Sequence, residues 1–247
     1  MLTVAIPSYK RADQINLKTL ETLRRGGVAQ ESIHIFVVPE ELQLYQQSCP
    51  GYQIIPGVLG LIKQREFIQN YFALETYIIM LDDDLSDICL VLSDKQKKSV
   101  DNLPQMFHEM MDTMKSTDTP ICGIYPCDNM KFSFANPKIT TDFRYLVGAA
   151  YIVRNLREIH LSTIDSLEDR ERTVLYWLKY GRILRFNHIF TKTKYFGRGG
   201  LESDDRLSKH SDHAKLLCDM FPELLRLKAC KGYDDAKCRK IKKSMPE

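Results

Sequence analysis

Three consecutive aspartates, Asp82 to Asp84, follow the apolar run at residues 77–81. An apolar run that is typical of a buried strand is an unfavourable place for three like charges unless a cation is present. In an extended chain, Asp82 and Asp84 point to the same side, about 7 Å apart. Hard carboxylate oxygens are ligands for Mg²⁺ or Mn²⁺, and such sites usually include substrate phosphates. We therefore predict a metal at Asp82 and Asp84 that neutralises a leaving nucleoside diphosphate; an acidic loop that caps the next helix is the alternative.

The elements that position this run alternate in type through the first half of the chain. Short apolar runs with Pro or Gly nearby predict strands, and apolar residues at helical spacing predict helices. The expected strands are residues 2–6, 33–38, 52–57 and 77–81, and the expected helices are residues 13–25, 39–47 and 61–73. This alternation predicts a parallel sheet with helices on both faces and right-handed crossovers.

The second half of the chain is more mixed. The pattern predicts helices over residues 102–115 and 165–180, strands in residues 121–126, 145–154 and 182–193, and a polar, helical last forty residues. The 247 residues, 44% of them hydrophobic, are enough for one large domain. We therefore predict an α/β fold with a mixed, mainly parallel central sheet flanked by helices. Residues 1–200 form its body, and residues 201–247 are a basic helical extension packed against it.

Three loops follow strands of the predicted parallel sheet. They have the sequences PSYKR (7–11), PGVLG (56–60) and DDDLSD (82–87). Ligands of open α/β sheets bind beyond the carboxyl ends of the strands. The topology therefore brings these three loops together at one edge, which is where we expect the site.

Four motifs, in this order, make the chain resemble the GT-A glycosyltransferases, a Rossmann-like fold. They are VAIPSYKR (4–11), GLIKQREFIQNYF (60–72), an apolar strand followed by D-x-D (77–84), and SLEDRERTVLYWLKYGRILRFNHI (166–189). Each motif alone is weak, but four in the right order are strong. The resemblance covers residues 2 to about 190.

The resemblance implies a binding site for a nucleotide sugar. Pro7, Ser8, Tyr9 and Arg11 would line the pocket for the base and phosphates, with Tyr9 stacked on the base. Arg65 would approach the base or diphosphate, although a solvated helix arginine is the commoner case.

Within the aspartate run, the resemblance implies a different contact for each residue. Asp82 would face the ribose or sugar, Asp83 the sugar or backbone amides, and Asp84 the metal. Gly148, in a segment rich in small residues, would let the backbone approach the donor sugar, unless it reflects plain strand packing.

The resemblance also suggests a general base and a further metal ligand. Glu168 and Asp169 are the candidates for the carboxylate that takes the acceptor's proton in an inverting transfer, and the family pattern favours Asp169. Acidic residues are also favoured in a first helical turn by the helix dipole, and a retaining enzyme would need no such base. His210 would complete the metal shell, with Asp212 or His213 as substitutes, unless this stretch is an ordinary polar helix start.

A narrower likeness is to the DNA-base glycosyltransferases associated with TET and base J dioxygenases, found in kinetoplastids, phages and other viruses. It rests on residues 6–28, 33–42, 57–72 and 78–85. Glu66 departs from the pattern, since the family usually has Asn after the arginine of that helix. The resemblance implies transfer of a sugar, with glucose expected, from a UDP-sugar to a 5-hydroxymethylpyrimidine in DNA.

Basic and aromatic residues near the C-terminus agree with a DNA acceptor. Lys192, Lys194, Tyr195 and Arg198 could contact phosphates and an unstacked base. Residues 226–243 hold eight Lys or Arg against two Asp, a charge of +6, so the rest of this +3 chain sums to −3. The alternative for the segment from Lys192 to Arg198 is a Gly-rich lid over the donor. The alternative for residues 226–243 is a solubilising tail.

Several classes of protein are excluded or disfavoured by composition. No run approaches the eighteen apolar residues of a membrane span, and the start of the chain lacks the features of a signal peptide. Seven scattered cysteines without a C-x-x-C pair favour buried thiols in a reducing compartment over a zinc site or disulfides. We expect an intracellular enzyme of unknown oligomeric state. Transfer to a glycan or protein, and an inactive module that binds DNA, are the alternative functions.

Overall fold

A computed structural model describes residues 2–162, 164–193, 206–230 and 232–241. Its strands are β1 (Val4–Pro7), β2 (Ile33–Val37), β3 (Gln53–Pro56), β4 (Tyr77–Leu81), β5 (Asp87–Val91), β6 (Lys97–Ser99), β7 (Ile121–Tyr125), β8 (Ile139–Thr140), β9 (Ala150–Arg154), β10 (Leu184–Lys192), β11 (Leu225–Cys230) and β12 (Tyr233–Cys238). Its α-helices are α1 (Thr19–Arg25), α2 (Leu42–Ser48), α3 (Leu61–Tyr71), α4 (Leu103–Ser116), α5 (Met130–Phe134), α6 (Glu168–Tyr180) and α7 (Arg206–Met220).

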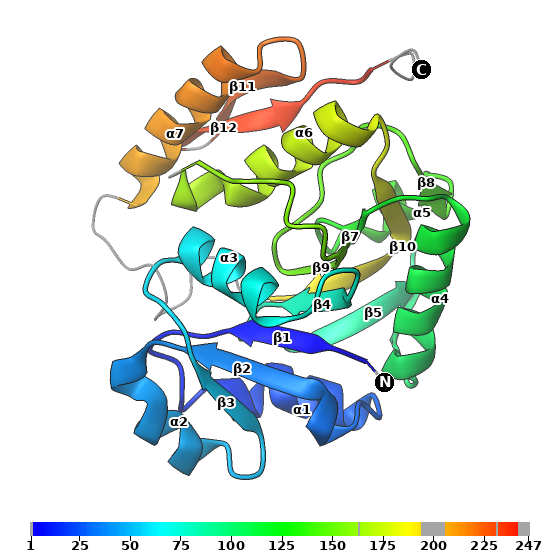
Figure 1. Cartoon of the computed structure of the whole chain (residues 1–247). Coiled ribbons are helices and arrows are strands. Elements are labelled where there is room, and N and C mark those ends of the chain that lie inside the picture. Colours follow the sequence, from blue (N-terminus) through cyan, green and yellow to red (C-terminus); the bar gives the residue numbers. More distant parts are fainter. Residues whose placement is uncertain (1, 163, 194–205, 231, 242–247) are drawn as a thin grey trace.

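A ten-stranded mixed sheet forms the centre of the molecule (Figure 1). Its strand order is β3-β2-β1-β4-β9-β7-β10-β5-β6, and β8 pairs with β10. The pairs β1–β2, β2–β3 and β1–β4 are parallel, which confirms the parallel half predicted from the alternating pattern. β9 then runs antiparallel to β4, so the start of β9 lies beside the end of β4. This arrangement brings the segment before β9 to the edge that carries the aspartate run.

Alternating side chains on the strands separate two hydrophobic cores. Val4 and Ile6 pack in the core that also contains residues of α1 and α4, whereas Ala5, between them, packs in the core under α3 and α6. Buried strands with apolar side chains on both faces require helices on both faces, and Figure 1 shows α3 and α6 together in front of the sheet.

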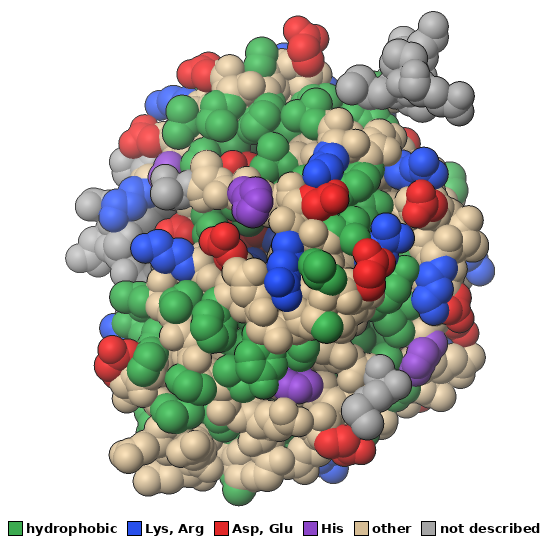
Figure 2. All heavy atoms as spheres, in the orientation of Figure 1, with side chains coloured by type: hydrophobic (Ala, Val, Ile, Leu, Met, Phe, Trp, Pro, Cys, Tyr) green, Lys and Arg blue, Asp and Glu red, His purple; other side chains and the backbone are tan. Residues whose placement is uncertain are grey.

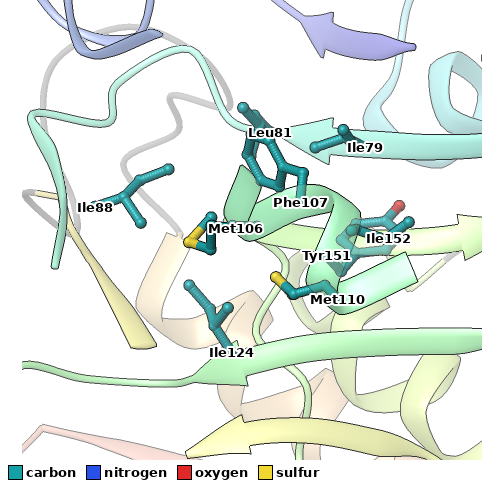
Figure 3. A pocket seen from close by; sticks show the side chains of 10 residues that line it. Ile79, Leu81, Ile88, Met106, Phe107, Met110, Ile124, Tyr151 and Ile152 are labelled. Carbon is teal, nitrogen blue, oxygen red and sulfur yellow. The ribbon is translucent and has the colours of Figure 1, made fainter. Parts of the chain in front are cut away.

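The first core contains an apolar cavity under α4 (Figure 3). Met106 and Met110 of α4 line it together with Leu81 of β4 and Ile152 of β9. Its cavity volume is only ≈ 10 Å³, and none of its lining residues is Asp, Glu, Lys, Arg or His. It is therefore a packing feature of the core.

The C-terminal part of the chain differs from the sequence prediction. Helix α7 is followed by an antiparallel hairpin of β11 and β12, so the last forty residues are helical only in part. Apolar side chains of α7, β11 and β12 join the core under α3 and α6. Strands β5, β6 and β8 and helix α5 were not predicted either. Within the described ranges, no helix is long and apolar enough to cross a membrane.

Candidate active site

The aspartate run begins where β4 ends. The backbone N–H of Asp82 still donates to the carbonyl of Ala149, at 2.9 Å, whereas Asp83 and Asp84 lie in a turn. The alternation of an extended strand therefore does not apply beyond Asp82, and the three side chains have different partners.

Asp83 is buried against the first loop. Its Oδ2 accepts a hydrogen bond from Ser8 Oγ at 2.6 Å, and its Oδ1 contacts Arg11 Nη1 at 2.5 Å. Tyr45 of α2 lies 2.7 Å from Ser8 Oγ and accepts from the Arg11 backbone N–H. Burial raises the pKa of Asp83, and the charge of Arg11 opposes this rise. Asp83 thus ties the loop after β1 to the loop after β4.

Asp82 and Asp84 are the more accessible members of the run. Asp84 lies 3.2 Å from Arg11 Nη1 and accepts from Thr193 Oγ1 at 2.8 Å, while the side chain of Asp82 is 36% exposed. The pKa of Asp82 is raised, first by burial of its carboxylate and then by the charges of Asp84 and Asp83, against the effect of Arg65. A bound cation would relieve this repulsion.

Arg65 joins this acidic loop to the second acidic motif. Its Nη2 lies 3.4 Å from Asp82 Oδ1, 3.1 Å from Glu168 Oε1 and 3.3 Å from the carbonyl of Gly148. Its Nη1 donates to Tyr151 Oη at 2.8 Å. The residue is 4% exposed, so its guanidinium is a fixed link between α3, β4 and α6.

Glu168, at the start of α6, lies between two arginines. Its second oxygen contacts Arg172 Nη1 at 2.5 Å, one turn along the helix, and the side chain is 5% exposed. Both carboxylate oxygens are therefore paired with buried guanidinium groups. This pairing gives Glu168 a structural function at the head of α6.

Asp169 points toward the segment before β9. Its Oδ2 accepts from the Tyr145 hydroxyl and from the Gly148 backbone N–H, the latter at 3.2 Å. A Cβ added at Gly148 would lie 2.9 Å from Glu168 Oε1, so only glycine fits without displacing this carboxylate. Asp169 is half-buried, and it is less enclosed than Glu168.

The remaining predicted residues fall into three groups. Pro7 ends β1, and Tyr9 is half-buried with Lys10 Nζ over its ring. Lys192 ends β10, where its Nζ contacts Asp87 at 3.1 Å. Lys194, Tyr195 and Arg198 lie outside the described residues.

His210 of α7 contacts the C-terminal hairpin. Its Nε2 lies 3.5 Å from Asp235, and its ring packs edge-on against Tyr233. His213, also on α7, is 2.7 Å from Ser166 Oγ. A metal-binding function for either histidine remains a prediction.

The donor set at the aspartate run fits a hard divalent cation. Within the described ranges, no group of three or more His, Cys, Asp or Glu side chains is arranged to hold a metal ion. Mg²⁺ is commonly held by one or two carboxylates, with water and substrate phosphates completing the shell. Asp82 and Asp84 match that requirement, since the Asp82 side chain is 36% exposed and the charges of Asp84 and Asp83 add to the effect of burial in raising its pKa.

Comparison with known families decides the class. A family model described as TET-associated glycosyltransferase matches residues 2–195. The chain belongs to this family. It is therefore a glycosyltransferase, and the likeness stated from the four motifs is confirmed. No curated protein sequence matches it.

Solved structures confirm the GT-A fold of this glycosyltransferase. TarS residues 1–349 of S. aureus superpose with a TM-score of 0.50 and 15% identity, covering 90% of this chain and 72% of TarS. The mannosyltransferase PcManGT of Pyrobaculum calidifontis, in complex with GDP-Man and Mn²⁺, gives a TM-score of 0.51 and 13% identity, covering 90% of this chain and 63% of PcManGT. At such identities the likeness concerns the fold.

The glycosyltransferase site also contains residues that sequence reasoning did not single out. These are Tyr45, Tyr145, Tyr151, Arg172 and Thr193. Arg172 lies inside the motif at residues 166–189, and Tyr151 lies inside a predicted strand. The partner of Tyr151 is 86 residues away, and the partner of Arg172 is on the same helix, whose rotation is unknown beforehand. Of these five residues, only Tyr151 has a signal in the sequence, because a hydroxyl-bearing side chain stands there within an apolar strand.

Proposed function

We propose that this glycosyltransferase transfers a sugar, with glucose as the expected one, from a UDP-sugar to the hydroxymethyl group of a modified pyrimidine in DNA. The observation that carries the proposal is the position of Arg65. One guanidinium contacts both Asp82, on the predicted metal side, and Glu168, the neighbour of the predicted base. This contact supports the proposal that the metal side and the base side of the reaction are neighbours.

The donor side uses the loops after β1 and β4. Ser8 and Arg11, fixed by Asp83, form a frame beside Asp82 and Asp84. Mn²⁺ or Mg²⁺ held there would stabilise the charge on a leaving diphosphate. PcManGT, which shares the fold, holds a nucleotide sugar and Mn²⁺. Pro7 and Tyr9 would lie along the base, and His210 remains a candidate further ligand.

Asp169 is the general base that we propose for an inverting transfer. Glu168 has both oxygens paired with arginines, whereas Asp169 accepts from a hydroxyl and a backbone N–H and is more accessible. A carboxylate in this position can take the proton of an acceptor hydroxyl as the sugar bond forms. Gly148 is packed against Glu168, which takes the space that a side chain at this position would need.

A DNA acceptor is proposed from the family and from charge. The family is named for its association with TET, and the C-terminal residues 226–243 carry a net +6. Lys192 lies at the end of β10, and Thr193, next to it, contacts Asp84. Lys192 would then meet the acceptor strand close to the proposed metal site. An intracellular location is part of this proposal.

The test is a transfer assay with Mn²⁺, a panel of nucleotide sugars, and duplexes that contain hydroxymethyluracil, hydroxymethylcytosine or normal bases only. Nucleosides are weighed after digestion. We expect a hexose on a modified base, and Asp84→Asn should lower this product at least about 100-fold, because a metal ligand is lost. Asp101→Asn, an exposed aspartate, is the matched control.

The other outcomes separate the alternatives. Hydrolysis of the UDP-sugar without a DNA product would contradict the DNA acceptor and favour a glycan or protein. DNA binding with neither hydrolysis nor transfer would favour an inactive binding module. Full transfer by Asp84→Asn would refute the metal site.

A further inference from the structure

A second pocket opens on the outer side of Arg65, between α3 and α6. The segment that follows β9 closes it, and its cavity volume is ≈ 160 Å³. Arg65, Arg157, His160, Arg172 and Tyr176 are among its lining residues. Figure 2 shows basic, acidic and histidine side chains gathered over α3 and α6 on this face. Asp82, Asp83, Asp84 and Asp169 are not part of its lining, and Arg65, which contacts Asp82, is the residue that the pocket shares with the proposed reaction site.

Two buried guanidinium groups in the lining have unused donors. Arg65 and Arg172 are each 4% exposed. Among the described residues, no hydrogen-bond partner exists for Arg65 Nε or for Nε and Nη2 of Arg172. The Arg172 guanidinium lies 3.8 Å from the centre of the Tyr151 ring, and such stacking satisfies its charge but not its N–H groups. Buried donors without partners are costly and are rare in folded proteins.

The charges around the pocket favour an anion. Of the charged residues that line the pocket, Arg65, Arg157 and Arg172 are basic and only Glu66 is acidic. Glu168 and Asp82, which pair with Arg65, are not part of the lining. Glu66 is 61% exposed, so its charge is screened by solvent. The charge of the lining residues is therefore positive even with His160 neutral.

We propose that this pocket binds a phosphate group. In this proposal the three N–H donors without partners, which are buried in the structure as it stands, turn toward the ligand. Donors on two separate guanidinium planes match a tetrahedral acceptor with several oxygens better than a planar carboxylate. The phosphate comes either from free phosphate or from the backbone of a DNA strand. The inference does not rest on the proposed function, because binding needs neither sugar donor nor metal.

The test measures inorganic phosphate binding by calorimetry, with EDTA present so that no metal at Asp82 and Asp84 recruits the ligand. We expect weak, millimolar binding. His160→Glu should raise the Kd about threefold to tenfold by placing a negative charge at the rim, and Leu161→Trp should weaken binding by filling the pocket. His108→Glu makes the same charge change on α4, across the sheet, and should leave the Kd unchanged.

The Nε–H resonances of Arg65 and Arg172 should also shift when phosphate is added. A single-stranded oligodeoxynucleotide without modified bases tests the source. Competition with phosphate and sensitivity to His160→Glu would identify a DNA backbone, whereas a response to phosphate alone would identify free phosphate. Absence of binding, arginine resonances that do not move, or equal Kd values for wild type, His160→Glu and Leu161→Trp would overturn the proposal.

Discussion

The substitution Glu168→Gln tests the buried charge network at the head of α6. Glu168 lies 3.1 Å from Arg65 and 2.5 Å from Arg172, and all three side chains are at most 5% exposed. At an effective dielectric constant of about 20, these distances correspond to gross attractions of about 5 and about 7 kcal/mol. Desolvation offsets much of this, but glutamine leaves the Arg172 guanidinium buried without a counter-charge and leaves Arg65 with Asp82 alone. Breaking buried pairs in this way costs about 3–5 kcal/mol.

The assay is chemical and thermal unfolding without ligands. For a chain of this size, about 1 kcal/mol corresponds to a shift of about 2–4 °C, so Tm should fall by about 6–20 °C. Glu21→Gln is the matched control, because Glu21 forms an exposed pair with Arg24 that contributes less than about 1 kcal/mol. If Glu168→Gln lowers the stability no more than Glu21→Gln does, the claim that Glu168 neutralises two buried arginines is refuted.

Three further predictions concern packing and pH. Gly148→Ala should lower donor hydrolysis at least about tenfold, because the new Cβ displaces Glu168; unchanged rates would contradict the tight fit. Asn155→Ala should destabilise the protein by about 1–3 kcal/mol in urea unfolding, since Asn155 Nδ2 donates to the carbonyls of residues 69, 72 and 73 at the end of α3. Burial lowers the pKa of His34, so the unfolded chain binds its proton more tightly. The stability of the fold should therefore fall as the pH drops below about 6.5. Urea midpoints measured at about pH 7.5 and about pH 5.5 should differ less for His34→Phe than for the wild type. The control His108→Phe should show the same difference as the wild type.

Much of the first half of the fold could be predicted, because each element there carries a local signal. Apolar runs such as residues 33–38 end at Pro, Gly or Asp, and they form buried strands whose carboxyl ends share one edge. The hairpin of β11 and β12 also has a local signal, which the prediction of a helix overlooks. Leu225, Leu227 and Ala229 alternate with basic residues, and Gly232 adopts a φ of 88° at the turn.

The candidate site likewise has features that the sequence predicts and features that it does not. The acidic residues and Arg65 could be predicted, since paired carboxylates directly after an apolar strand repel one another unless a cation lies between them. The contacts that each of these residues makes could not be predicted. Asp83 is engaged by Ser8 and Arg11, and Glu168 by two arginines, through contacts that depend on how loops and helices face one another in three dimensions.

The C-terminal hairpin contacts this site although it lies beyond residues 2–195, which the family model matches. Arg170, next to the proposed base, donates from Nε to the carbonyl of Ala236 at 2.8 Å, and its Nη2 lies 3.3 Å from Asp235 of β12. The same guanidinium lies over the ring of Tyr145, whose hydroxyl donates to Asp169. Contacts thus run from β12 through Arg170 and Tyr145 to the proposed base. Because a base must be held within hydrogen-bond reach of the acceptor hydroxyl, the hairpin is a structural support of the site.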